Sequence, residues 1–333
     1  MDSNAKPKII LYSVKEYDVV RFERFSKQFN MKFLEHRLDE RTAVFAYGCD
    51  AVVACPMDII TAPVIDELVE CGVKLLAMRS DGYNNVDIAH ARGRLSVVRV
   101  PDYSPYSVAE FAAALMFTLI RSTHKAYNRT RSHDFSINNL AGFELHGKTC
   151  GIVGEGRIGS CAVSICKGIG MKVLVNTPHP RGTPGVEYCS LDELFERSDV
   201  IQLHCPLTEA NRHMINDASI ARMKQGALLI NTARGGLVDS EALIRGLVSR
   251  RIRGAALDVY ENEGGTFTVD YTNDILEDRV LQILLGFPNV IITSHQAYFT
   301  EESLENICIT TMENIREFLE TGECKNLIGT PAV

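Results

Sequence analysis

The sequence has no excess of positive charge, no long apolar run and no internal repeat. Its 333 residues carry 35 Lys and Arg against 42 Asp and Glu, and the net charge of -7 argues against nucleic acid or an anionic membrane as the main partner. The longest apolar run, residues 111–117, is too short to span a bilayer, and residues 1–4 do not resemble a signal peptide. We therefore expect a cytoplasmic protein without nucleic-acid or membrane partners.

The ten cysteines lack any C-x-x-C pair, and several of them lie in apolar segments. This pattern predicts the buried, reduced thiols of a cytosolic protein rather than disulfides or metal ligands. Cys205 is a candidate catalytic thiol, but the neighbouring Pro206 and Leu207 favour the end of a strand at this position.

Strands and helices alternate along the chain, and its length exceeds what one hydrophobic core usually serves, so we expect two α/β domains with parallel sheets. In the first series, strands are predicted at residues 8–12, 50–54, 74–78 and 96–100, with helices at 17–29 and 63–71. In the second series, strands are predicted at residues 149–153, 172–175, 200–204, 227–231, 254–259 and 290–294. These strands, separated by helices, suit a doubly wound dinucleotide-binding sheet.

Three further segments predict how the domains connect. Residues 107–121 form a nearly all-round apolar helix, which must be buried and therefore indicates a domain or subunit boundary, with a homodimer as the expected assembly. Residues 121–146 are polar and turn-rich, as expected of a connecting arm. Residues 301–320 form an amphipathic helix that ends before Gly322. If this helix packs on the first series, the first domain is discontinuous and the second is an insert.

The most informative motif is G-E-G-R-I-G at residues 154–159, which follows an apolar strand and opens a helix. Gly154 allows a tight turn, Gly156 lets the backbone approach a pyrophosphate, and Gly159 lets the helix pack on the strand. The anion would lie on free N–H groups at the helix N-terminus, where the helix dipole favours negative charge. The motif therefore predicts a dinucleotide site in the middle of the chain.

Polar residues follow three successive strands of the second series, at the edge where open parallel sheets bind ligands: Arg234, Asp258 with Glu263, and His295. Each alone is typical of a cap or a surface charge, but their shared place at strand ends predicts a common site. An arginine holds a carboxylate by two hydrogen bonds, and a histidine exchanges a proton near neutral pH. A nearby carboxylate favours the charged histidine and fixes its tautomer. With a dinucleotide, this set suits hydride transfer to the carbonyl group of a 2-oxo acid.

With these motifs the chain resembles the D-specific 2-hydroxyacid dehydrogenases over nearly its whole length, and most closely the D-lactate dehydrogenases among them. Besides the glycine loop, the resemblance is carried by residues 84–87 (NNVD), 100–105 (VPDYSP), 204–208 (HCPLT), 231–235 (NTARG), 258–263 (DVYENE) and 294–297 (SHQA). It implies two Rossmann-like, doubly wound parallel-sheet domains with a cleft between them. The substrate-binding domain would comprise residues 1–101 and 296–333, and the inserted dinucleotide-binding domain residues 102–295.

The resemblance also implies roles for the matching residues. His295 would exchange the substrate proton, Glu263 would pair with it, and Arg234 would bind the substrate carboxylate. The cofactor, NAD or NADP, would contact Gly154, Gly156, Arg157, Ile158, Gly159, Asn176, Thr177, His179, Arg181, His204, Cys205, Pro206, Thr232, Ala233 and, on the nicotinamide side, Asp258. The substrate would contact Ser80, Asp81, Gly82, Tyr103, Arg234 and Tyr298. The implied reaction is the reduction of a 2-oxo acid, with pyruvate as first choice, to the D-2-hydroxy acid, and the reverse.

Two residues depart from the family pattern. Thr177 stands where NAD-specific members carry an acid for the ribose 2′-OH, so both NADH and NADPH stay open, with His179 or Arg181 able to attract a 2′-phosphate. Asp81 stands in the carboxylate-binding turn, where relatives place a small or apolar residue and where an inward carboxylate would repel pyruvate. We expect Asp81 to point to solvent or to cap the turn at residues 84–85.

Alternative functions stay open at this point. A broader reductase of branched or aromatic 2-oxo acids would use the same residues. A nucleotide-sensing binding protein, like the corepressors that resemble this family, would bind the cofactor with little turnover, and the complete set of Arg234, Glu263 and His295 argues against it. Glu261 is expected to be a solvated neighbour of the pairing acid, and Tyr103 and Tyr298 are interpreted equally well as half-buried packing residues.

Overall fold

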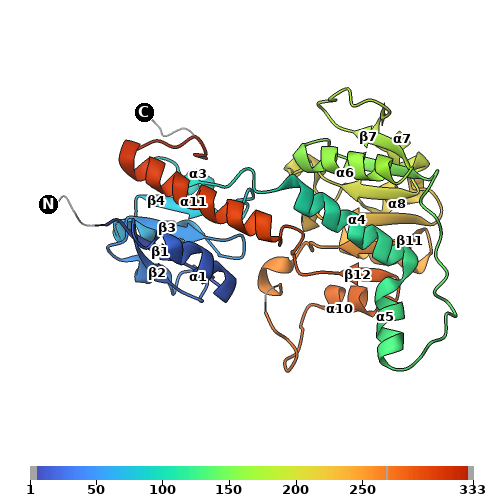
Figure 1. Cartoon of the computed structure of the whole chain (residues 1–333), viewed down its shortest axis with the longest axis horizontal. Coiled ribbons are helices and arrows are strands. Elements are labelled where there is room, and N and C mark those ends of the chain that lie inside the picture. The colour runs from blue at the N-terminus through green and yellow to red at the C-terminus, as the bar shows by residue number, and fades with distance from the viewer. Residues whose placement is uncertain (1–5, 268, 329–333) are drawn as a thin grey trace. The chain divides into compact units, whose positions relative to one another are not determined.

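The chain forms two compact units, each built on its own parallel sheet (Figure 1). The computed structural model describes residues 6–267 and 269–328. Unit 1 comprises residues 1–104 and 300–333, and unit 2, residues 105–299, is inserted between these two segments. The prediction of two parallel-sheet α/β domains is thus confirmed. The predicted domain boundaries and roles stay predictions, and the last part of the predicted first domain, residues 329–333, lies outside the described residues.

The sheet of unit 1 has five strands in the order β2-β1-β3-β4-β5. They are β1 (Lys8–Leu11), β2 (Asn30–Phe33), β3 (Ala51–Ala54), β4 (Leu75–Met78) and β5 (Ser96–Val98). Because side chains alternate along a strand, Ile10 and Val52 pack toward α2 (Ala62–Glu70) and α3 (Ile88–Ala91). Ile9 and Val53 pack on the other face with α1 (Glu16–Phe22) and α11 (Glu301–Thr321). The helix predicted at residues 301–320 therefore completes the core of the unit in which the chain begins.

Unit 1 differs from the prediction in the length of a helix and in an additional strand. The helix predicted at residues 17–29 is too long, because α1 ends at Phe22 and a short 3-10 helix follows at Glu23–Phe25. Strand β2 was missed altogether. It lies at the edge of the sheet, and all four of its residues are partly or fully exposed, so it lacks the apolar run that revealed the central strands.

The sheet of unit 2 has seven strands in the order β12-β11-β10-β9-β6-β7-β8. They are β6 (Thr149–Val153), β7 (Lys172–Asn176), β8 (Glu187–Tyr188), β9 (Val200–Leu203), β10 (Ala227–Asn231), β11 (Ile252–Leu257) and β12 (Val290–Ile292). The two-residue strand β8 was not predicted. Since the order reverses between β6 and β9, the carboxyl ends of these strands form the switch point at which doubly wound sheets bind nucleotides.

Helices cover both faces of this sheet. On one face, α4 (Pro105–Arg121) and α6 (Arg157–Gly168) pack side by side over residues such as Ile152 and Ile230 (Figure 1). The other face is covered by α7 (Leu191–Arg197), α8 (Asp217–Arg222) and α9 (Ser240–Val248). Helix α10 (Arg279–Gly286) packs beside β12. Burial on both faces explains why the central strands are almost entirely apolar.

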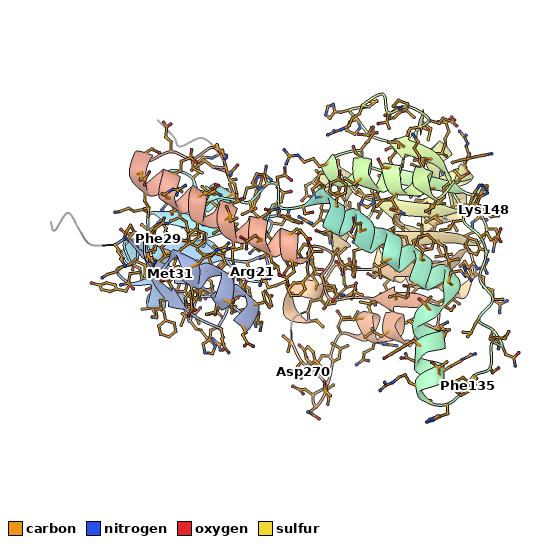
Figure 2. The ribbon with its side chains drawn as sticks, viewed as in Figure 1. Arg21, Phe29, Met31, Phe135, Lys148 and Asp270 are labelled. Carbon is orange, nitrogen blue, oxygen red and sulfur yellow. The ribbon has the colours of Figure 1, made fainter. Side chains whose placement is uncertain are left out.

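The predicted connecting arm, residues 121–146, contains a helix that the sequence reading missed, α5 (Thr123–Arg131). None of its residues is buried, so it has no apolar face from which to predict it. Phe135 and Ile137, beyond its end, are 75% and 83% exposed, and Figure 2 shows Phe135 on this segment.

The homodimer stays a prediction. In the described residues, no helix is both long and apolar enough to cross a membrane.

Candidate active site

The glycine turn after β6 has the tight backbone geometry that the motif predicted. Gly154 has a φ of +95°, and its N–H donates to the carbonyl oxygen of Asn176 at 2.8 Å. A Cβ atom on Gly154 would lie 2.7 Å from the carbonyl oxygen of His204, and one on Gly159 would lie 2.0 Å from that of Gly154. Neither position accepts a side chain, and around Gly156 there is open space, so a ligand can approach the backbone there.

The N-terminus of α6 is arranged to receive an anion. The helix has 12 residues, begins at Arg157 and, within the described part of the chain, has no side-chain cap at Gly156. Its first N–H groups have no partner inside the helix, and the helix dipole adds positive potential there. A dinucleotide pyrophosphate fits this arrangement in both charge and space.

Two buried polar atoms at neighbouring strand ends lack a hydrogen-bond partner among the described residues: His204 Nδ1, after β9, and Thr232 Oγ1, after β10. Buried polar groups are normally paired, so unpaired ones at a sheet edge suit ligand contacts. The other ring nitrogen of His204, Nε2, lies 3.0 Å from Gln202 Oε1, and burial lowers the pKa of His204 to about 4. His204 is therefore neutral near pH 7 and offers a hydrogen bond rather than a charge.

Cys205 is held as a thiol rather than a thiolate, because burial raises its pKa to about 11. A thiol with a raised pKa is a poor nucleophile at neutral pH. This disfavours the catalytic-thiol alternative, and the residue lies just past the end of β9, as its neighbours in the sequence indicated.

His295 and Glu263 form a hydrogen-bonded pair, with 2.8 Å between His295 Nδ1 and Glu263 Oε1. The second oxygen of Glu263, Oε2, accepts the backbone N–H of Tyr260 at 2.9 Å. The side chains of His295 and Glu263 are 25% and 20% exposed, so the pair is half-buried. The carboxylate fixes the imidazole orientation and leaves Nε2 available for a substrate.

Asp258 organises the turn that carries His295. Its buried carboxylate accepts hydrogen bonds from Thr293 Oγ1 at 2.5 Å, Gln296 N at 2.9 Å and Ala297 N at 2.8 Å. Its carbonyl oxygen accepts the backbone N–H of His295 at 2.8 Å. His295 itself has a φ of +54°, in the left-handed region that few residues other than glycine adopt. The predicted contact of Asp258 with the nicotinamide stays a prediction, whereas these bonds make it a positioning residue for His295.

We expect Asp258→Asn to lower the free energy of unfolding by about 1–3 kcal/mol, because an amide cannot accept all three hydrogen bonds and leaves a buried donor unpaired. Turnover should fall as His295 loses its orientation, while the Kd for NADH stays close to the parent value. Urea unfolding, kcat and cofactor titration check this. Asp217→Asn on α8 is the matched control, because its ion pair with Arg245 is exposed. Weaker NADH binding at unchanged stability would instead support a direct contact with the nicotinamide.

Arg234 lies in a loop that buried Asn231 holds in place. Asn231 accepts the N–H of Ala233 at 3.0 Å and donates its side-chain N–H to the carbonyl oxygen of Arg234 at 3.0 Å. Sequence reasoning did not give Asn231 this role, although an amide at the end of a buried strand is a usable signal. A Cβ atom on Gly235 would lie 2.1 Å from the carbonyl carbon of Tyr260, so the Arg234 loop packs directly on the loop that leads to Glu263.

The guanidinium of Arg234 donates to the carbonyl oxygen of Ala233 at 2.7 Å. Strands β10, β11 and β12 are neighbours in the sheet, so the loops bearing Arg234, Glu263 and His295 emerge side by side at its carboxyl edge. The structure pairs the last two directly. Convergence of Arg234 with them on one substrate stays a prediction, supported by this strand order.

A second histidine–carboxylate pair lies in unit 2, with 2.9 Å between His213 Nε2 and Glu261 Oε2. Glu261 also accepts the backbone N–H of Ser240 at 3.1 Å. The interpretation of Glu261 as only a solvated neighbour is therefore wrong, because it joins two loops. It does not pair with His295 among the described contacts.

In unit 1, the turn that carries Ser80, Asp81 and Gly82 follows β4. Ser80 Oγ donates to the carbonyl oxygen of Gly82 at 2.6 Å. The side chain of Asp81 is 47% exposed, in line with the expectation that it points to solvent, and it forms an ion pair with Arg99 at 2.6 Å. The sequence did not predict this partner, and the arginine on the neighbouring strand end offsets the charge that would repel a carboxylate.

The remaining predicted residues are placed as follows. Tyr103 and Tyr298 are both half-buried, and the carbonyl oxygen of Tyr103 accepts a hydrogen bond from Asn306 at 2.6 Å. Asn176 donates its side-chain N–H to the carbonyl oxygen of Cys189 at 3.0 Å. Of the other predicted cofactor contacts, Arg157 and Ile158 are the first two residues of α6, Pro206 lies in the loop after β9, and Ala233 lies in the loop after β10.

Comparisons with known proteins agree with this geometry. Residues 113–297 match the family model described as D-isomer specific 2-hydroxyacid dehydrogenase, NAD binding domain. A D-lactate dehydrogenase of Escherichia coli is 44% identical over 96% of this chain and 99% of its own length. An aromatic 2-oxoacid reductase of Clostridium sporogenes is 39% identical over 96% of this chain and 98% of its own. A solved pyruvate reductase of Chlamydomonas reinhardtii superposes with a TM-score of 0.91 at 43% identity, covering 97% of this chain and 99% of that one.

Proposed function

Because this chain belongs to the D-isomer specific 2-hydroxyacid dehydrogenases, we propose that it reduces a 2-oxo acid to the D-2-hydroxy acid with NADH, and catalyses the reverse reaction with NAD. Pyruvate and D-lactate are the first choice. The observation that carries the proposal is the His295–Glu263 pair at 2.8 Å, at the same sheet edge as the glycine turn and the uncapped N-terminus of α6.

The residues of this edge have separate tasks in the proposed reaction. A dinucleotide held by the glycine turn and the N-terminus of α6 would supply the hydride in reduction and take it up in oxidation. His295 donates a proton from Nε2 to the carbonyl oxygen during reduction, and removes it during oxidation. Glu263 stabilises the charged imidazole and keeps Nδ1 occupied. Arg234 binds the substrate carboxylate through its planar guanidinium.

The second candidate within the family is a reductase of larger 2-oxo acids, and it is favoured by the similarity to the aromatic 2-oxoacid reductase. The alternative of a nucleotide-sensing binding protein would require the glycine turn but not a histidine–carboxylate pair, so the presence of that pair argues against it. NADPH is the competing cofactor, because Thr177 stands where an acidic residue would repel a 2′-phosphate.

The test is oxidation of NADH, followed by absorbance, with a panel of pyruvate, branched and aromatic 2-oxo acids. We expect turnover with the panel and the highest kcat/KM with pyruvate, and chiral analysis of the product should find the D isomer. A higher kcat/KM for an aromatic acid would support the broader reductase. NADH binding without turnover on any member would support the sensing protein.

A further inference from the structure

An acidic side chain occupies the phosphate-binding turn itself. Glu155 lies between Gly154 and Gly156, where a carboxylate pointing outward would repel a pyrophosphate. It is only 3% exposed, and its carboxylate points instead into the segment that follows β7. The side chain is therefore buried beside the cofactor site without standing in the path of the phosphates.

Three donors from this segment fix the Glu155 carboxylate. Oε1 accepts Thr183 Oγ1 at 2.6 Å, and Oε2 accepts Tyr188 Oη at 2.8 Å and the backbone N–H of Arg181 at 3.2 Å. Tyr188 Oη in turn accepts the N–H of Thr183 at 2.9 Å, which closes the network. Although burial acts to raise it, these hydrogen bonds hold the pKa of Glu155 below its usual value, so the group is charged at neutral pH.

This network ties the glycine turn to the residues that follow β7. In doubly wound folds the ribose 2′-OH is bound at the end of the second strand, which is β7 here. Gly154 is tied to that strand end through Asn176. The next residue, Thr177, carries no charge, and its Oγ1 accepts the N–H of His179 at 3.3 Å. The strand end thus carries no charge of its own, and the segment that follows it binds the carboxylate of Glu155.

We propose that Glu155 is a cofactor-specificity residue, whose fixed negative charge takes the place of the acid absent at Thr177 and disfavours the 2′-phosphate of NADPH. The inference rests on the proposed function only in that the cofactor is a nicotinamide dinucleotide. The side chains of His179 and Arg181 are exposed, so their attraction for a phosphate is screened by water and salt. The charge of Glu155 is buried and held by three hydrogen bonds, so it is screened less.

The experiment compares the Kd of NADH and of NADPH for the parent and for Glu155→Gln, by calorimetry without a 2-oxo acid. Glutamine keeps the shape and removes the charge. We expect the ratio of the NADPH Kd to the NADH Kd to fall by about tenfold, which corresponds to about 1.4 kcal/mol. An unchanged ratio, or equal weakening of both cofactors, would overturn the proposal and leave Glu155 with a purely structural role.

Two further variants separate the effect of the Glu155 charge from the effect of an altered loop conformation. Tyr188→Phe removes one hydrogen bond from Glu155 and keeps its charge, so the ratio should stay at the parent value. Thr177→Asp tests the proposal even if Glu155→Gln fails to fold. Because Glu155 already supplies the charge, the added acid should raise the preference for NADH by less than about threefold. A larger rise would overturn the proposal. NADH binding without 2-oxo acid turnover would contradict the proposed reaction, but the Kd ratio would still decide the role of Glu155.

Discussion

Replacement of His295 by alanine is expected to lower kcat for 2-oxo acid reduction by about 10²- to 10⁴-fold, the range supplied by a positioned general acid. The imidazole is the proton donor in the proposed reaction, and Glu263 and Asp258 hold its ring in a fixed orientation. In the variant, only water can donate this proton, and nothing orients it toward the carbonyl oxygen. The Kd for NADH should change by less than about twofold, since the glycine turn and α6 are untouched. Single-turnover kinetics and cofactor titration measure the two quantities.

The second histidine–carboxylate pair of unit 2 provides the matched control. His213→Ala removes an imidazole paired with Glu261 at a similar distance, 2.9 Å, but on a different loop. This variant should keep kcat near the parent value. Equal losses in the two variants would mean that the proton donor is assigned wrongly, and full turnover of His295→Ala would contradict the proposed mechanism outright.

Replacement of Arg234 by glutamine is expected to lower kcat/KM for pyruvate by about 30- to 4000-fold, which corresponds to the 2–5 kcal/mol typical of losing one partner of a buried charge pair. Glutamine offers a neutral amide where the guanidinium presents two parallel donors to a carboxylate. Much of the loss should appear as a higher KM, because the carboxylate is present in the ground state as well as in the transition state.

Arg253→Gln is the control for charge alone. Arg253 lies near the start of β11, away from the carboxyl edge, where its guanidinium stacks on Phe143 at 4.7 Å. Its replacement removes the same charge from the same sheet and should leave kcat/KM unchanged. A parent-like KM in Arg234→Gln would show that the substrate carboxylate is bound elsewhere.

Features that depend on local pattern were predictable from the sequence. The glycine turn is one, because Gly154 and Gly159 are required by contacts of the backbone with itself. The central strands are another, since burial on both faces demands apolar residues throughout. The grouping of Arg234, Glu263 and His295 at one edge followed from the rule that parallel strands present their carboxyl ends together.

Features that depend on distant partners were not predictable. The exposed helix α5 and the edge strand β2 have no apolar face to reveal them. The ion pair of Asp81 needs Arg99 on another strand end, and the sequence does not show which side chains face each other. The sequence analysis assigned no role to Glu155, because its three donors lie more than twenty residues further along the chain.

The left-handed backbone conformation of His295 limits how this protein can be made more stable without losing activity. A residue with a side chain in this conformation costs of order 1 kcal/mol or more, and the hydrogen bonds of Asp258 offset that cost. Glycine would relieve the strain and delete the imidazole in the same step. Laboratory selection for heat resistance alone would therefore favour exchanges at this position that inactivate the protein, and such a screen must retain an activity filter.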